Sequence, residues 1–123
     1  MARILLAEDD DAVRELVARA LADDGHELTA TADGAAAFDA LGRHDGQFDL
    51  LLTDVKMPVM DGIALALVAG RDHPDLTIML MTGYADQRER AHGLDALVHD
   101  VISKPFSVEQ IKGAVREALI ARH

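Results

Sequence analysis

The stretch Phe48-Asp49-Leu50-Leu51-Leu52-Thr53-Asp54 decides the fold, because an uninterrupted apolar run stops abruptly on an acidic residue. A run of this length predicts a buried strand over 48–53, and the loop behind it carries Met57-Pro58 and Asp61-Gly62. Other apolar runs occur on either side of it. They predict further strands over 4–7, 27–31, 76–81 and 97–102.

The segments between these runs predict helices over 11–24, 35–41, 63–71 and 107–121, with helical periodicity, and a polar, poorly patterned helix over 86–94. Asp10 or Asp11 can cap the first helix and Gly25 can end it, while Gly42 closes the second. In the third helix Leu67 follows Ile63 by one turn. One face of the first helix is formed by Val13, Leu16, Val17, Ala20 and Leu21.

This alternation of strands and helices predicts the α/β class, with a doubly wound parallel sheet, helices on both faces and right-handed crossovers. The 123 residues are expected to form a single domain over 1–123. A net charge of −10 argues against nucleic acid as a partner. No apolar run is long enough for a membrane span, and the N-terminus is predicted to be a strand instead of a signal peptide. Together with the absence of cysteine, this predicts a cytoplasmic protein.

Polar residues follow the predicted strands at the edge where such sheets bind ligands. Glu8, Asp9, Asp10 and Asp11 follow the first strand, Asp54 the third, Thr82 and Gly83 the fourth, and Ser103, Lys104 and Pro105 the fifth. Converging carboxylates repel one another, and Mg²⁺ with oxygen ligands resolves that conflict. A carboxylate can also attack phosphorus to give an aspartyl phosphate, with a lysine and a hydroxyl neutralising charge around it.

Each of these residues also has a purely structural reading. The acids after the first strand can serve as helix N-terminal residues, Asp54 can be a turn residue, Thr82 a helix cap and Lys104 a solvated side chain. Their joint placement at four strand ends favours a site. The Lys104–Pro105 bond is a candidate cis peptide.

The chain resembles response-regulator receiver domains, the CheY-like superfamily, over its whole length. The matching pieces are 4–10, 49–58 with 60–62, 81–83 and 104–106. The resemblance implies a flavodoxin-like (βα)5 fold with strand order 2-1-3-4-5 and no output domain. It implies that Asp54 accepts a phosphoryl group from a histidine kinase or histidine phosphotransfer protein. Mg²⁺ would then be bound by Asp9, by Glu8 through water, by Asp54 and by the backbone carbonyl of Lys56.

The same resemblance implies that Thr82 hydrogen-bonds the phosphoryl group and moves when it arrives, and that Lys104 pairs with a phosphoryl oxygen. Two positions depart from the family pattern. Val101 stands where receivers usually carry an aromatic switch residue, and Gly83 stands where they usually carry alanine. Tyr84 could replace the missing aromatic or be an ordinary loop residue.

The segments 1–10, 81–91 and 100–106 further resemble the CpdR group of single-domain regulators. This implies a protein partner, ClpX in the ClpXP protease, for which the unphosphorylated form is an adaptor. The protein is then a signalling switch that assists its own phosphotransfer and dephosphorylation, not a turnover enzyme. A phosphorelay shuttle or sink and a phosphorylation-independent pseudo-receiver remain alternatives. A phosphatase with an aspartate nucleophile, or a flavin carrier, fits the acids of the first loop poorly.

Overall fold

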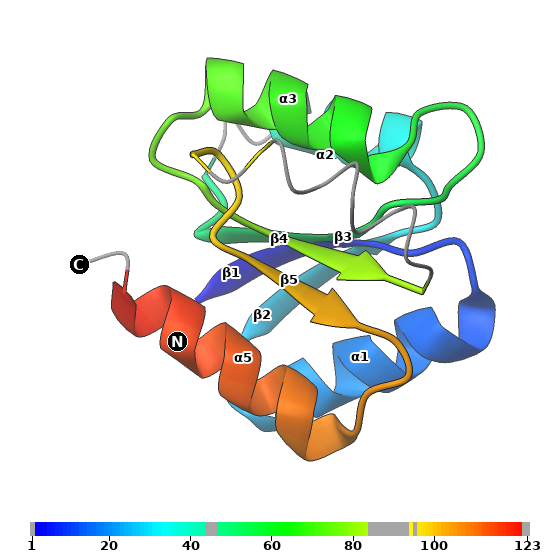
Figure 1. The fold of residues 1–123 in the computed structure, drawn as a ribbon, viewed down its shortest axis with the longest axis vertical. Helices are drawn as coiled ribbons and strands as arrows, with labels where there is room; N and C mark the ends of the chain where they lie inside the picture. The colour runs from blue at the N-terminus through cyan, green and yellow to red at the C-terminus, as the bar shows by residue number, and fades with distance from the viewer. Residues whose placement is uncertain (1, 44–46, 84–93, 95, 122–123) are drawn as a thin grey trace.

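Five parallel strands form one sheet in the order β2-β1-β3-β4-β5 in the computed structural model of the chain (Figure 1). The structure describes residues 2–43, 47–83, 94 and 96–121. The strands are β1 (Arg3–Ala7), β2 (Glu27–Thr31), β3 (Leu50–Asp54), β4 (Thr77–Thr82) and β5 (Asp100–Ser103). This confirms the predicted flavodoxin-like sheet, and it places β3 at the centre, between β1 and β4.

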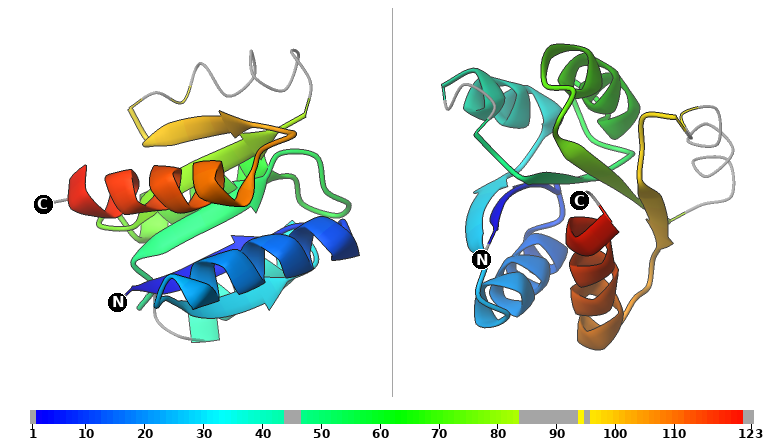
Figure 2. Two further views of the ribbon diagram at one scale, coloured as in Figure 1. Left: turned by 90° about the horizontal axis from the view of Figure 1, so that it is seen from below. Right: turned by 90° about the vertical axis from the view of Figure 1, so that its left-hand side faces the viewer.

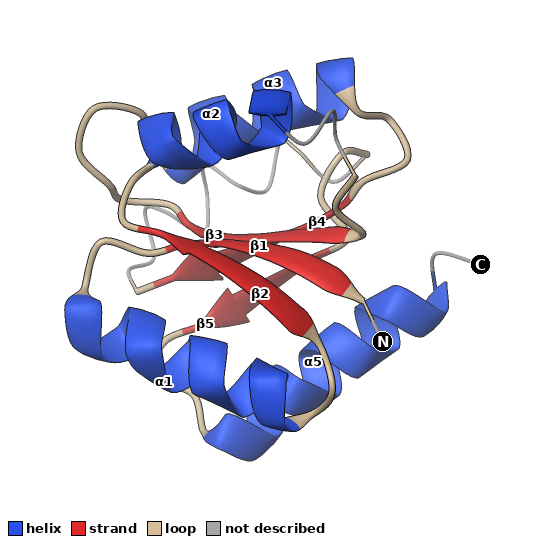
Figure 3. Ribbon diagram, turned by 180° about the vertical axis from the view of Figure 1, so that it is seen from behind, coloured by secondary structure: helices blue, strands red, loops and turns tan. Residues whose placement is uncertain are grey.

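The helices cover both faces of the sheet, as the alternation predicted (Figures 1 and 3). α1 (Asp11–Asp23) and α5 (Val108–Ala121) lie on one face, and α2 (Gly34–Arg43) and α3 (Gly62–Asp72) lie on the other. Figure 2 shows the sheet between these two layers. The helix predicted over 86–94 falls almost wholly outside the described residues. None of the described helices combines the length and the apolarity that a membrane crossing needs.

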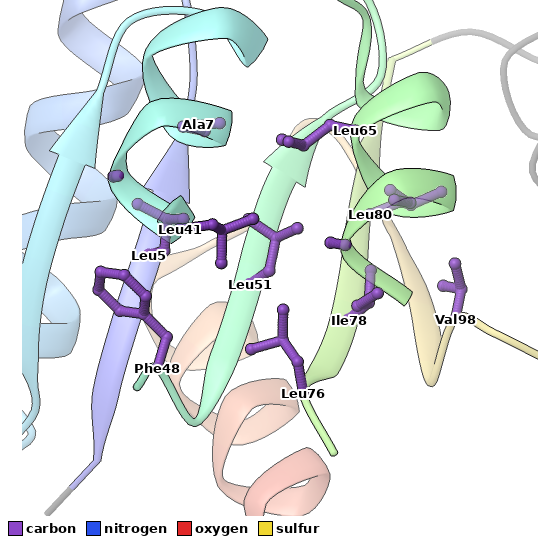
Figure 4. Close-up of a cluster of buried hydrophobic side chains, with 14 of the residues drawn as sticks. Leu5, Ala7, Leu41, Phe48, Leu51, Leu65, Leu76, Ile78, Leu80 and Val98 are labelled. Atoms are coloured by element: carbon purple, nitrogen blue, oxygen red, sulfur yellow. The ribbon is translucent and has the colours of Figure 1, made fainter. Parts of the chain in front are cut away.

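The central strand β3 contributes side chains to two separate hydrophobic cores, because successive strand residues point to opposite faces. Leu51 packs beneath α2 and α3, in the cluster of Figure 4, whereas Leu50 and Leu52 pack against α1 and α5. All five residues of β3 are buried. Each leucine removed from water contributes about 2 kcal/mol, which is why this strand is a continuous apolar run instead of an alternating one.

Side-chain caps fix where two helices begin next to the strand ends. The Asp10 carboxylate accepts hydrogen bonds from the N–H groups of Ala12 and Val13 at 2.9 and 3.1 Å, so Asp10 and not Asp11 is the N-cap of α1. The Asp61 carboxylate caps α3 in the same way through the N–H group of Ala64. Both caps accept hydrogen bonds from N–H groups of the first helical turn, which have no carbonyl partner within the helix.

Some local expectations were wrong. Gly42, which was expected to close the second helix, lies inside α2, which continues to Arg43. Leu16 and Leu67, which were expected on apolar helix faces, are 47% and 50% exposed. In α3 almost every residue is apolar, so spacing alone does not select the buried face; the sheet selects Leu65 with Ala66 and Ala69 instead.

Candidate functional site

The site lies at the carboxyl ends of the parallel strands, where residues that follow β1, β3 and β5 line one cleft together with Gly83 after β4. A cleft of about 770 Å³ opens there. The predicted site residues that line it are Glu8, Asp9, Asp10, Asp54, Lys56, Gly83, Lys104 and Pro105. Residues from sequence positions almost a hundred apart thus share one cleft, as the strand-end rule for such sheets requires.

Asp54 is the last residue of β3, and its carboxylate is held at one oxygen and faces a cation at the other. Oδ1 accepts a hydrogen bond from the N–H group of Val55 at 3.0 Å. Oδ2 lies 3.2 Å from the Nζ atom of Lys104. The side chain is only 8% exposed, so the cation acts on it through a medium of low effective dielectric. The carboxylate is therefore restrained and charge-compensated inside the cleft.

The backbone around Asp54 is fixed by two neighbours that the sequence reading did not assign to the site. The Thr53 hydroxyl donates to the Asp54 carbonyl oxygen at 2.9 Å. Gly62 packs so closely that a Cβ atom there would lie 2.0 Å from the same oxygen. The Asp61-Gly62 pair was visible in the sequence as a loop signal, but only the fold shows that the glycine makes room for Asp54.

Glu8 is fully buried, and Lys104 is its main partner. Lys104 Nζ donates to Glu8 Oε1 at 2.6 Å, and the N–H group of Asp10 donates to Oε2 at 3.1 Å. Burial raises the pKa of Glu8 from its ordinary 4.5 to about 7, although the hydrogen bond from Lys104 opposes this. Burial by itself would lower the pKa of Lys104, but the bond to Glu8 and the charge of Asp54 raise it above its usual value. The lysine therefore stays charged between two carboxylates.

Glu8, Asp9 and Asp54 each place a carboxylate oxygen within 4.8 Å of the other two. Hard oxygen donors at this spacing fit a divalent cation such as Mg²⁺, which commonly combines a few carboxylates with water. Asp9 is exposed, so it offers an open approach from solvent, whereas Glu8 and Asp54 are buried. One ammonium for three acids leaves the cluster with an excess of negative charge, which a cation would relieve.

The remaining predicted residues lie around this centre. Thr82 ends β4 and is buried, and its carbonyl oxygen accepts the N–H group of Lys104 at 2.7 Å. A Cβ atom on Gly83 would meet nothing within 4 Å, so space does not require glycine there. Val101 is half-buried and packs against the core beneath α2 and α3. The Lys104–Pro105 bond is cis. Tyr84 lies outside the described residues.

Comparisons with known proteins agree with this geometry. Residues 4–116 match the family described as response regulator receiver domain. The response regulator receiver protein CpdR of Brucella abortus (strain 2308) is 40% identical over 121 residues, 98% of this chain and 99% of that protein. The sensor kinase CckA of the same organism is 34% identical over 118 residues, 96% of this chain but 12% of the kinase.

A solved structure provides a further comparison. The response regulator TrrA of Thermotoga maritima, in complex with Mg²⁺ and beryllium fluoride, matches with a TM-score of 0.83 and 26% identity. The match covers 96% of this chain and 99% of that one. From its sequence match, its sheet order and the residues at its strand ends, the chain belongs to the family of response regulator receiver domains.

Proposed function

We propose that this protein is a two-component signalling switch in which Asp54 accepts a phosphoryl group in a Mg²⁺-dependent reaction. The observation that carries the proposal is the placement of Asp54 Oδ2, 3.2 Å from the Lys104 ammonium and next to the carboxylates of Glu8 and Asp9. A nucleophile, a fixed cation and a set of metal ligands are what phosphoryl transfer to a carboxylate needs.

In the proposed transfer, an Asp54 oxygen attacks the phosphorus of a phosphohistidine on a histidine kinase or phosphotransfer protein. The new O–P bond forms as the N–P bond breaks, and the electron pair leaves with the imidazole nitrogen. Lys104 offsets the charge that reaches the cleft, and the Thr82 hydroxyl donates to a phosphoryl oxygen. Glu8, Asp9, Asp54 and the backbone carbonyl of Lys56 would hold Mg²⁺, which when bound neutralises phosphoryl charge.

The phosphorylated state would be read by a separate protein. Phosphate on Asp54 would draw Thr82, the buried last residue of β4, towards the cleft. Val101 cannot swing as an aromatic side chain would, so the signal would pass mainly through Thr82. As the resemblance to the CpdR group implies, the unphosphorylated form would be an adaptor for ClpXP, and the 40% identity to a CpdR protein supports that resemblance.

A second candidate is a phosphorelay shuttle or sink that passes phosphate between histidine proteins. The match to a segment of the sensor kinase CckA favours it, because that segment belongs to a protein of the signalling pathway instead of a downstream effector. The two candidates share the chemistry at Asp54 and differ only in the partner that receives the signal.

The test of the shared chemistry is modification of Asp54. Incubation with Mg²⁺ and a small phosphodonor should add the mass of one phosphoryl group to the intact protein, and Asp54→Asn should add none. EDTA should prevent the change in the wild type. If the mass never changes, or if Asp54→Asn is modified equally, the proposal fails.

The adaptor and the shuttle are separated by their partners. Immobilised ClpX N-terminal domain should retain Asp54→Ala better than the wild type treated with beryllofluoride and Mg²⁺. Equal retention, or none, would refute the adaptor. Transfer of phosphate from the labelled protein back to a histidine phosphotransfer protein would then favour the shuttle.

A further inference from the structure

Arg14 connects helix α1 to the loop that carries the acidic residues. Its Nη1 atom donates to the carbonyl oxygen of Glu8 at 2.9 Å, and its Nη2 atom donates to Asp11 Oδ1 at 2.5 Å. The side chain is 24% exposed, so the bond to the Glu8 carbonyl is largely shielded from water. A guanidinium can make both bonds at once because its donors form a rigid planar fork.

The bond from Arg14 fixes the peptide group that joins Glu8 to Asp9. On the other side of Asp9, the N–H group of Asp10 is held by the Glu8 carboxylate at 3.1 Å, and the Asp10 side chain caps α1. Asp9 is exposed, so these backbone anchors and not packing set the direction of its carboxylate. Arg14 thus supplies a side-chain anchor directly on the peptide group that precedes Asp9.

We propose that Arg14 is a positioning residue for the divalent cation site, and that it acts by holding the Glu8–Asp9 peptide so that Asp9 meets Glu8 and Asp54. This proposal rests on the proposed Mg²⁺ site. Residues that orient metal ligands commonly contribute tenfold or more to metal affinity, so loss of Arg14 should weaken Mg²⁺ binding about tenfold.

The sign of the effect separates positioning from simple electrostatics. Arg14 carries a positive charge near the acids, and a positive charge repels Mg²⁺. If Arg14 acted through its charge alone, replacing it with a neutral side chain would tighten Mg²⁺ binding. If it acts by holding the loop, the same replacement weakens binding, because the lost order of Asp9 outweighs the repulsion that is removed.

The experiment is calorimetric titration of the full chain with Mg²⁺ at constant ionic strength, without a phosphodonor. Arg14→Met keeps the apolar stem and removes the fork, and Arg14→Lys keeps the charge. Arg19→Met is the matched control, since Arg19 lies on the same helix, is 78% exposed and pairs only with Glu15 in the described structure. Far-UV circular dichroism establishes that each variant is folded.

We expect Arg14→Met to bind about tenfold more weakly, Arg14→Lys to be weakened although its charge is kept, and Arg19→Met to stay within about twofold of the wild type. Unchanged or tighter binding by Arg14→Met overturns the proposal. If that variant does not fold, wild-type affinity in Arg14→Lys overturns it instead. Failure of the wild type to bind Mg²⁺ would refute the proposed function itself, which distinguishes the two failures.

Discussion

The stability of the metal-free protein should fall as the pH rises through neutrality, and Glu8 should cause the fall. Glu8 is fully buried, and burial raises its pKa from 4.5 to about 7. The folded state therefore binds a proton between these values that the unfolded chain has released. The contribution of Glu8 is complete below pH 4.5 and is lost as the pH rises through 7. At about 1.4 kcal/mol per pH unit, the loss is about 3 kcal/mol.

Glu8→Gln removes this dependence because an amide does not titrate. The free energy of unfolding can be measured by urea unfolding followed by circular dichroism, in EDTA from about pH 5 to about pH 8. Across that range the difference between the variant and the wild type should shift by about 3 kcal/mol in favour of the variant. Glu15→Gln is the matched control, since Glu15 lies on α1 and is 71% exposed. The free energy of unfolding of this control should depend on pH as that of the wild type does. Comparison between proteins cancels the titration of the groups that do not interact with Glu8.

Added Mg²⁺ should act in the opposite direction, because it binds the deprotonated carboxylate. The wild type should gain more stability from Mg²⁺ at pH 8 than at pH 5, and Glu8→Gln should gain less than the wild type at either pH. Parallel stability curves of the wild type and Glu8→Gln in EDTA from about pH 5 to about pH 8 would show that Glu8 does not cause the pH dependence.

Three further substitutions test the packing around the site and the backbone. Gly62→Ala should lower the free energy of unfolding in urea by about 3 kcal/mol and slow phosphorylation of Asp54, because the new Cβ atom would lie 2.0 Å from the Asp54 carbonyl oxygen. Wild-type values for both would contradict this. Gly113→Ala should stabilise by about 1 kcal/mol, since it lies within α5 with nothing near its Cβ position, and a lower melting temperature would contradict it. Val59→Gly should raise the free energy of unfolding by about 1 kcal/mol, because a φ of 71° strains a β-branched residue and the 87% exposed side chain contributes little packing. A loss of stability would contradict this.

Much of the site was visible in the sequence because its signals are local. The apolar run that stops at Asp54 predicted a buried strand with an acid at its end, and Asp9 and Lys104 were found in the same way. Parallel strands must bring their carboxyl ends to one edge, so a list of strand ends was enough to predict which side chains would meet. The aspartate caps of α1 and α3 were also local signals.

The burial of individual residues was decided only by the tertiary structure. Glu8 and Asp9 are adjacent acids, yet Glu8 is buried because its N–H group bonds to the Thr31 carbonyl oxygen and continues the pairing of β1 with β2, whereas Asp9 has left the sheet. The exposure of Leu16 and Leu67 has the same origin, since periodicity defines an apolar face but not the neighbour that covers it.

The chain alone therefore determined the strands, the starts of the described helices to within one residue, and the set of residues at the carboxyl edge, because these depend on neighbours within a few positions. Only the assembled sheet decided that Lys104 would reach Glu8, 96 residues away, and that Arg14 would hold the Glu8 carbonyl. Those contacts depend on which strands are adjacent and how deeply each end is buried, and these properties arise from the packing of all the elements together.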